Sequence, residues 1–275
     1  GVSVLGAPAA RGQTTWPANN TAGPSRVTIP LHGVAPEPPD LRYQLLPRAS
    51  DLHRGNAALE YATAVGSIPA DRPAEETQEL DTGQAATLAD VDEKAATALL
   101  ARYASAMKQL HLAASDDRVD WQSGLLSEGF AAPLPNLAPL RRLSEVLVVG
   151  IRLDLKRRDF TAAHEKLQTG FALARHLGEG DTIIQGLVGV AIAGQMTHEV
   201  EEWIGTEGSP NLFWPLAYMP RPLLDAARGW AMEKDAAYFS IPELRQMREG
   251  RTTAESWTRF TTRSEQVEVG DYGDH

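Results

Sequence analysis

Three consecutive segments decide the fold: PNLAPLRRLSEVLVVGIRLDLK (135–156), FTAAHEKLQTGFALARHLGEG (160–180) and DTIIQGLVGVAIAGQMTHEVEEWI (181–204). In the first segment, apolar residues recur every three or four positions and therefore share one helix face: Leu140, Leu143, Leu147 and Ile151. The second segment repeats this spacing with Phe160, Ala163, Leu167, Phe171, Ala174 and Leu177. Such stripes need neighbours that bury them, so the spacing predicts three stacked helices.

The links between these segments are short. Only 157–159, Arg-Arg-Asp, separates the first two, and a connection of this length predicts an antiparallel hairpin. Gly178 and Gly180 provide a C-terminal stop for the second helix, and Asp181 or Thr182 provides an N-cap for the third. The fold class that we predict is all-α, with helical hairpins stacked as a short array or bundle.

The third segment contains three glycines, Gly186, Gly189 and Gly194. In an exposed helix interior each costs about 1 kcal/mol relative to Ala. We therefore predict that a neighbouring helix approaches closely at these positions. The apolar run from Ile183 to Ala193 is about half of the ~20 residues that a membrane span requires, so we interpret it as core and expect no transmembrane segment.

The flanking sequence divides the chain into three parts. Residues 1–40 hold seven of the 18 prolines and show no periodicity, which predicts an extended or disordered lead-in. The all-helical domain is expected over 41–250, and the polar residues 251–275 are expected to form a loose tail.

Further helices are predicted inside the 41–250 domain. We expect one after Pro47, capped by Ser50 or Asp51, one over 90–114, one that begins at Pro222, and a short one over 242–249. Between the first two, the acidic run 75–79 is expected to be a solvated loop face.

Composition excludes several classes of function. A net charge of -10 without a basic stripe argues against a nucleic-acid ligand, and the pairs at 141–142 and 157–158 are interpreted as solvated helix ends. The chain has no cysteine, so disulfides, thiolate nucleophiles and zinc-thiolate sites are absent. No phosphate-binding or dinucleotide-binding glycine motif occurs, and we expect no cofactor.

The first ten residues bear on location. A short apolar run, 2–5, precedes Ala7-Pro8-Ala9-Ala10, which resembles the end of a signal peptide with its small-residue cleavage site. This pattern predicts an extracytoplasmic protein, periplasmic or secreted. The alternative is a truncated or processed chain whose alanine-rich start carries no information.

A second distinctive stretch, 209–222, contains four prolines and a concentration of aromatic side chains. Phe213, Trp214 and Tyr218 are the candidate binding residues, because aromatic rings on a rigid segment bind a peptide or sugar at low entropic cost. The alternative interpretation is a lid whose side chains close the end of the helical stack.

One local pattern could support catalysis. His198 and Glu202 lie one helical turn apart in His-Glu-Val-Glu-Glu (198–202), which resembles a helical zinc motif with a glutamate in place of the second histidine. A metal-assisted hydrolase using His198, Glu199 and Glu202 is therefore the alternative function. The competing interpretation is a polar helix end with Trp203 and Ile204 buried. His164 and His176 are interpreted as hydrogen-bonded surface or core histidines.

Two parts of the chain resemble known proteins. Leu147 to Leu177 looks like one tetratricopeptide-type helical hairpin. The order of YQLLP (43–47), GNAALEY (55–61) and PNLFW (210–214) is similar to that in uncharacterised secreted bacterial all-helical proteins, a likeness that implies no activity.

From the sequence as a whole we predict an exported helical interaction module or scaffold that binds a peptide, an envelope component or a partner subunit. The oligomeric state is left open.

Overall fold

The computed structural model describes residues 42–71, 87–129 and 136–269, together with Pro73, Glu76, Leu80 and Ala132. This part of the chain is all-helical, as predicted, and one isolated β-bridge joins His53 to Asp116. The expected lead-in, residues 1–40, lies outside the described residues.

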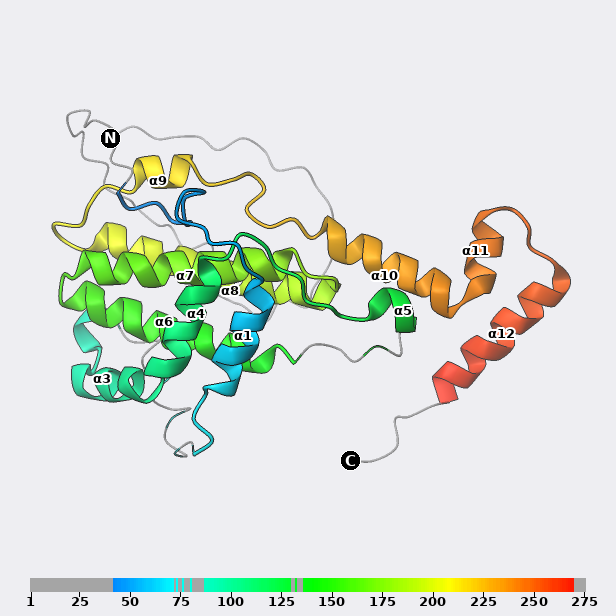
Figure 1. The fold of residues 1–275 in the computed structure, drawn as a ribbon, viewed down its shortest axis with the longest axis horizontal. Helices are drawn as coiled ribbons and strands as arrows, with labels where there is room; N and C mark the ends of the chain where they lie inside the picture. Colours follow the sequence, from blue (N-terminus) through cyan, green and yellow to red (C-terminus); the bar gives the residue numbers. More distant parts are fainter. Residues whose placement is uncertain are drawn as a thin grey trace, which may run out of the picture. The chain divides into compact units, whose positions relative to one another are not determined.

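The helices are labelled in Figure 1 in their order along the chain. They are α1 (Ala57–Gly66), the 3-10 helix η1 (Leu88–Asp90), α3 (Glu93–Arg102), α4 (Ala104–Ala114), α5 (Leu125–Glu128), α6 (Ala138–Lys156), α7 (Phe160–Gly178), α8 (Ile183–Gly205), α9 (Phe213–Ala217), α10 (Ala227–Ser240), α11 (Pro242–Arg248) and α12 (Ala254–Val269).

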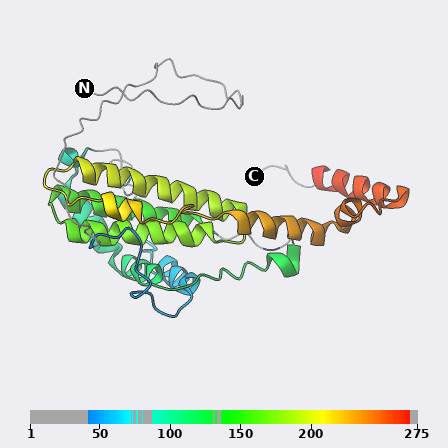
Figure 2. The ribbon, with the colours of Figure 1, turned by 90° about the horizontal axis from the view of Figure 1, so that it is seen from above.

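The long helices α6, α7 and α8 form the predicted stack, and both ribbon views show them side by side (Figures 1 and 2). α1 and α4 pack against this stack, and α3 packs on α6. One buried cluster joins α6 to α1, α3 and α4 and contains Leu143, Leu147 and Leu153. A second cluster joins α6, α7 and α8 and contains Phe171 and Trp203. Each fully buried side chain of this kind stabilises the fold by about 1.5–3 kcal/mol.

The start of α8 is fixed by the predicted cap. Thr182 accepts a hydrogen bond from the Gln185 backbone N–H and forms a capping box with that residue. α10 packs at the same end, where the Glu233 carboxylate accepts from the Ile183 N–H at 2.7 Å and Arg228 pairs with Asp181 at 2.8 Å. The N-terminal end of α8 is thus tied to α10 by charge-assisted contacts.

The glycine prediction is confirmed at one position only. A Cβ on Gly189 would lie 2.7 Å from the Ala174 carbonyl oxygen and 3.1 Å from the Gly178 nitrogen, so α7 approaches the α8 backbone closely there. At Gly186 a Cβ would make an ordinary 3.5 Å contact, and at Gly194 it would meet nothing within 4 Å. The prediction was wrong for these two: Gly194 lies on the outward face of α8, and Gly186 is buried but faces only the Ala226 side chain.

The single helix expected over 90–114 is two helices that meet at Tyr103. Tyr103 is fully buried and closes α3 while it opens α4. The break lets α3 pack on α6 while α4 packs on α1 and α7. A continuous straight helix could follow only one of these two packing directions.

The acidic run 75–79 is not a solvated face where the structure describes it. Glu76 is 0% exposed, and its carboxylate contacts Arg102 at 3.0 Å, Arg142 at 3.1 Å and the Tyr103 hydroxyl at 2.6 Å. Arg142 is accordingly not a free solvated helix end. Residues 75 and 77–79 lie outside the described part of the chain.

Two helix boundaries and the C-terminal tail also differ from the prediction. Asn56, rather than Ser50 or Asp51, caps α1 through a bond to the Ala58 N–H. The helix expected from Pro222 begins only at Ala227, because Leu223 and Leu224 pack against the buried clusters instead. The expected loose tail contains α12, in which Trp257 and Phe260 pair at 5.7 Å between ring centroids.

Candidate functional site

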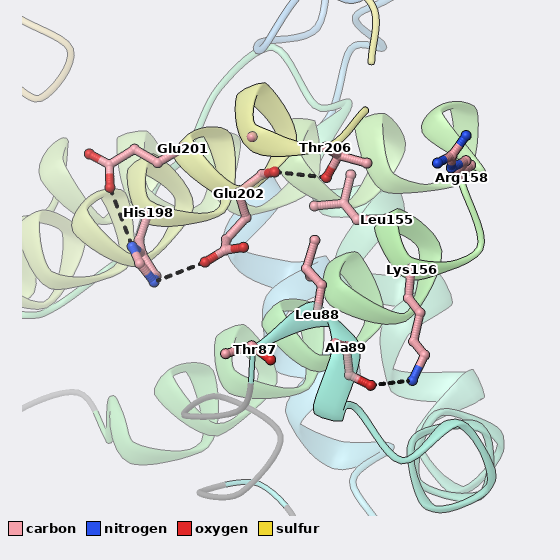
Figure 3. Close-up of a pocket in the computed structure, with 11 residues that line it drawn as sticks. Thr87, Leu88, Ala89, Leu155, Lys156, Arg158, His198, Glu201, Glu202 and Thr206 are labelled. Carbon is pink, nitrogen blue, oxygen red and sulfur yellow. Dashed lines mark hydrogen bonds and ion pairs between the residues drawn. The ribbon is translucent and has the colours of Figure 1, made fainter. Parts of the chain in front are cut away.

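The candidate site is an open pocket of about 660 Å³ between η1, the end of α6 and the C-terminal part of α8 (Figure 3). Helical spacing brings one wall together, since His198, Glu201 and Glu202 lie three and four residues apart on α8. The opposite side holds Lys156, the last residue of α6, and Arg158 in the turn that follows.

The imidazole of His198 lies between two carboxylates, as Figure 3 shows. Its Nδ1 is 3.4 Å from Glu201 Oε2, and its Nε2 is 4.0 Å from Glu202 Oε1. The His198 side chain is 55% exposed, so solvent screens both contacts and each contributes at most about 1 kcal/mol. The sequence prediction that His198 and Glu202 lie together is confirmed.

Glu199 does not join them. One residue further along α8 it faces inward, where its two carboxylate oxygens lie 2.9 and 3.1 Å from Arg152 Nε. Both side chains are buried, at 1% and 4% exposure. Burial raises the pKa of Glu199, and the Arg152 guanidinium opposes that rise. The predicted constellation of His198, Glu199 and Glu202 is therefore wrong, because the helical period separates Glu199 from the other two.

The cations of the pocket already have protein partners. Lys156 Nζ donates to the carbonyl oxygens of Ala89 at 2.9 Å and Val91 at 2.8 Å, which ties η1 to the end of α6. Arg158, at φ +58° in the turn before α7, pairs with Glu207 at 3.0 Å on the surface. Within the described residues, no group of three or more His, Asp or Glu side chains could hold a metal ion.

The aromatic candidates lie elsewhere, on α9 and directly after it. The Phe213 and Tyr218 side chains are 62% and 63% exposed, and Trp214 is half-buried. The Trp214 ring lies 5.3 Å from Phe213 and 6.2 Å from Tyr218, measured between centroids. We call these three side chains the aromatic surface.

The opposite side of α9 is anchored in the fold. Leu212 and Pro215 are buried, and Met219 packs against the cluster that contains Trp203. Trp203 Nε1 also donates to the Pro210 carbonyl at 2.9 Å. α9 thus covers core residues with one side, as the lid interpretation expects, and presents its rings to solvent on the other.

Sequence reasoning missed a buried polar pair beneath α1. The Tyr61 hydroxyl lies 2.7 Å from His176 Nδ1, and Trp121 stacks on the Tyr61 ring while its Nε1 donates to the His176 carbonyl. Burial lowers the pKa of His176 to about 4 and raises the pKa of Tyr61, so both groups are neutral at pH 7. The interpretation of His176 as a hydrogen-bonded core histidine is confirmed, but its partner lies 115 positions away.

Comparison with protein-family models, curated proteins and solved structures finds no match for this chain. The tetratricopeptide and bacterial-family resemblances therefore stay predictions. Among the helices that the structure describes, none has the length and hydropathy to cross a membrane.

Proposed function

We propose that this protein is an interaction module that binds a partner protein or peptide through the aromatic surface Phe213, Trp214 and Tyr218. The observation that carries this proposal is that buried Leu212 and Pro215 anchor one side of α9, while the other side holds exposed Phe213 and Tyr218 beside half-buried Trp214. Rings held in this way lose little conformational entropy on binding, which is why aromatic residues dominate binding hot spots.

The partner that this surface fits is an extended, proline-rich or aliphatic peptide. Such segments dock on exposed aromatic rings because a preformed extended backbone costs little further ordering. The net charge of -10 favours a partner with positive charge by steering the encounter. Export of the protein remains a prediction from its first ten residues.

Metal-assisted hydrolysis is the weaker proposal. It needs His198, Glu199 and Glu202 to converge, and Glu199 is committed to Arg152 on the inward face of α8. The pocket in Figure 3 keeps His198 and Glu202 together but offers them only solvated partners.

A displayed library of random peptides, selected on the full chain, tests the proposal. Peptides that bind through the aromatic surface are expected to lose roughly tenfold or more in affinity for Trp214→Ala, a typical hot-spot effect. Trp230→Ala is the matched control, because the Trp230 ring is 64% exposed on α10. Selected peptides that bind Trp214→Ala, Phe213→Ala and the unmodified chain equally would refute the proposal.

A further inference from the structure

The described chain begins with a segment, Tyr43–Leu46, that lies against its own helices in the manner of a bound peptide. In Figure 1 this first blue stretch is drawn between α9 and α7. Leu45 is 1% exposed and belongs to the buried cluster of α7, α8 and Leu212, with Tyr43 and Leu46 packed around it. A non-helical segment thus fills an apolar groove on the helical stack.

Two side chains of α7 recognise the backbone of this segment. The Gln44 carbonyl oxygen lies 2.6 Å from His164 Nε2 and accepts a second hydrogen bond from Gln168 Nε2 at 3.0 Å. His164 and Gln168 are one turn apart on α7, and both are partly buried. This clamp requires only a carbonyl at that position and is therefore independent of the side chain that the peptide carries there.

Aromatic contacts fix the residue that precedes the clamp. The Tyr43 ring meets His164 edge-on at 5.4 Å and Trp203 at 5.6 Å, measured between centroids. The groove therefore selects an aromatic ring, one free position and a leucine, in that order. Selection at alternate positions is how extended peptides are distinguished in other grooves.

The attachment of the segment is suited to exchange. Among the described residues, no backbone-to-backbone hydrogen bond joins 43–47 to any helix. Further along the chain, the His53 N–H donates to the Ser115 carbonyl at 2.7 Å, and residues 48–51, which lie before it, are exposed. The contacts of Tyr43–Leu46 described above thus run through its side chains and the Gln44 carbonyl, which a peptide of the same pattern would reproduce.

The long helices beside the groove are joined by contacts that do not involve the segment. α6 and α8 are joined by Arg152 and Glu199, and α7 and α8 by the close approach at Gly189. Leu212, which precedes α9, instead shares a buried cluster with Leu45. The long helices would thus stay together when the segment leaves.

We infer that this groove of α7, α8 and α9 is a peptide-binding groove that the chain occupies with its own residues 43–46. Its competing partner is an extended peptide with an aromatic residue two positions before a leucine. The tethered segment acts at an effective concentration in the millimolar range, so it suppresses binding of weaker peptides. This site is distinct from the aromatic surface of α9, and it does not rest on the function proposed above.

Binding of a labelled peptide with the sequence LRYQLLPR, residues 41–48, tests the inference by fluorescence anisotropy. The full chain carrying Tyr43→Ala and Leu45→Ala is expected to bind it roughly tenfold or more tightly than the unmodified chain, since the tethered competitor is weakened. Adding His164→Ala and Gln168→Ala to that variant should remove the gain in peptide affinity, because these two side chains bind the backbone carbonyl. Leu59→Ala, at a 63% exposed position of α1, is the matched control and should bind like the unmodified chain.

The inference is overturned if the double variant keeps a helical circular-dichroism spectrum and a cooperative melt but gains no affinity. Should that variant fail to fold, the methyl NMR signals of the unmodified chain decide. Excess LRYQLLPR must then shift the Leu45 methyl signals toward random-coil values while those of Leu143 on α6 stay unchanged, and unaltered Leu45 signals overturn the inference. Trp214→Ala should leave both results intact, which separates this test from that of the aromatic surface.

Discussion

The inner and outer faces of α8 differ in solvent exposure, although one continuous stretch of sequence supplies both. The inner face carries Met196, Glu199 and Trp203, all at most 1% exposed. The outer face carries Leu187 at 63% exposure and then His198 beside two solvated carboxylates. Since one residue step rotates a helix by about 100°, a motif that is continuous in sequence is divided between two environments. Adjacent glutamates on this helix therefore have different physical roles.

The largest effect is expected from the inward glutamate. Glu199→Ala should lower the free energy of unfolding by about 3–5 kcal/mol, because it removes the carboxylate paired with buried Arg152. Glu202→Ala, the outward control, should change it by at most about 1 kcal/mol. Urea denaturation measures both, and equal effects would show that the two faces do not differ in this way.

Apolar truncations should sharpen the same contrast. Met196→Ala removes a fully buried side chain and should cost about 2–5 kcal/mol, through lost burial and the cavity that remains. Leu187→Ala should stay within about 0.5 kcal/mol, as is usual for exposed positions. Thermal unfolding of the two variants compares them directly, and a large loss for Leu187→Ala would reveal that another surface covers the outer face.

Buried His176 should make stability depend on pH. Its pKa falls from 6.5 unfolded to about 4 folded, so its contribution is fully present above pH 6.5 and is lost as the pH falls toward 4. The loss should be about 3 kcal/mol. The raised pKa of nearby Asp116 acts in the opposite direction, so the difference between the unmodified chain and His176→Asn isolates the histidine. Parallel urea-stability profiles for the two proteins between pH 4 and 7 would contradict this assignment.

The smallest effect is expected at the outer rim of the pocket. Arg158→Gly should cost at most about 1 kcal/mol, because its ion pair with Glu207 is exposed and its backbone at φ +58° suits glycine. High salt should reduce the stability difference between the unmodified chain and Arg158→Gly, because it screens the exposed ion pair. A loss of more than about 2 kcal/mol in the free energy of unfolding, measured by urea denaturation, would show that this solvated rim contributes substantially to stability.

Local sequence patterns predicted the helices whose buried residues repeat along one face. The apolar spacing of α6 and α7, the short turn between them and the Thr182 cap of α8 were all recognisable, because each depends on residues within a few positions. The pairing of His198 with the glutamate at 202 was predicted for the same reason.

Contacts over long separations were not predictable. Glu76 pairs with Arg142 across 66 positions, and Arg152 pairs with Glu199 across 47. Nothing in the acidic run 75–79 distinguishes a buried carboxylate from a solvated one. The break at Tyr103 was missed for a related reason, since it depends on which neighbours α3 and α4 pack against.

The pairing of Arg152 with Glu199 fixes the register of α6 against α8. Sliding either helix by one turn, about 5.4 Å, would strand two charges in an apolar interior and expose no replacement for either. A ratchet-like displacement of the stack is thereby forbidden. A response of this protein to a bound molecule is therefore expected at its helix ends and peripheral segments, rather than as sliding of α6 along α8.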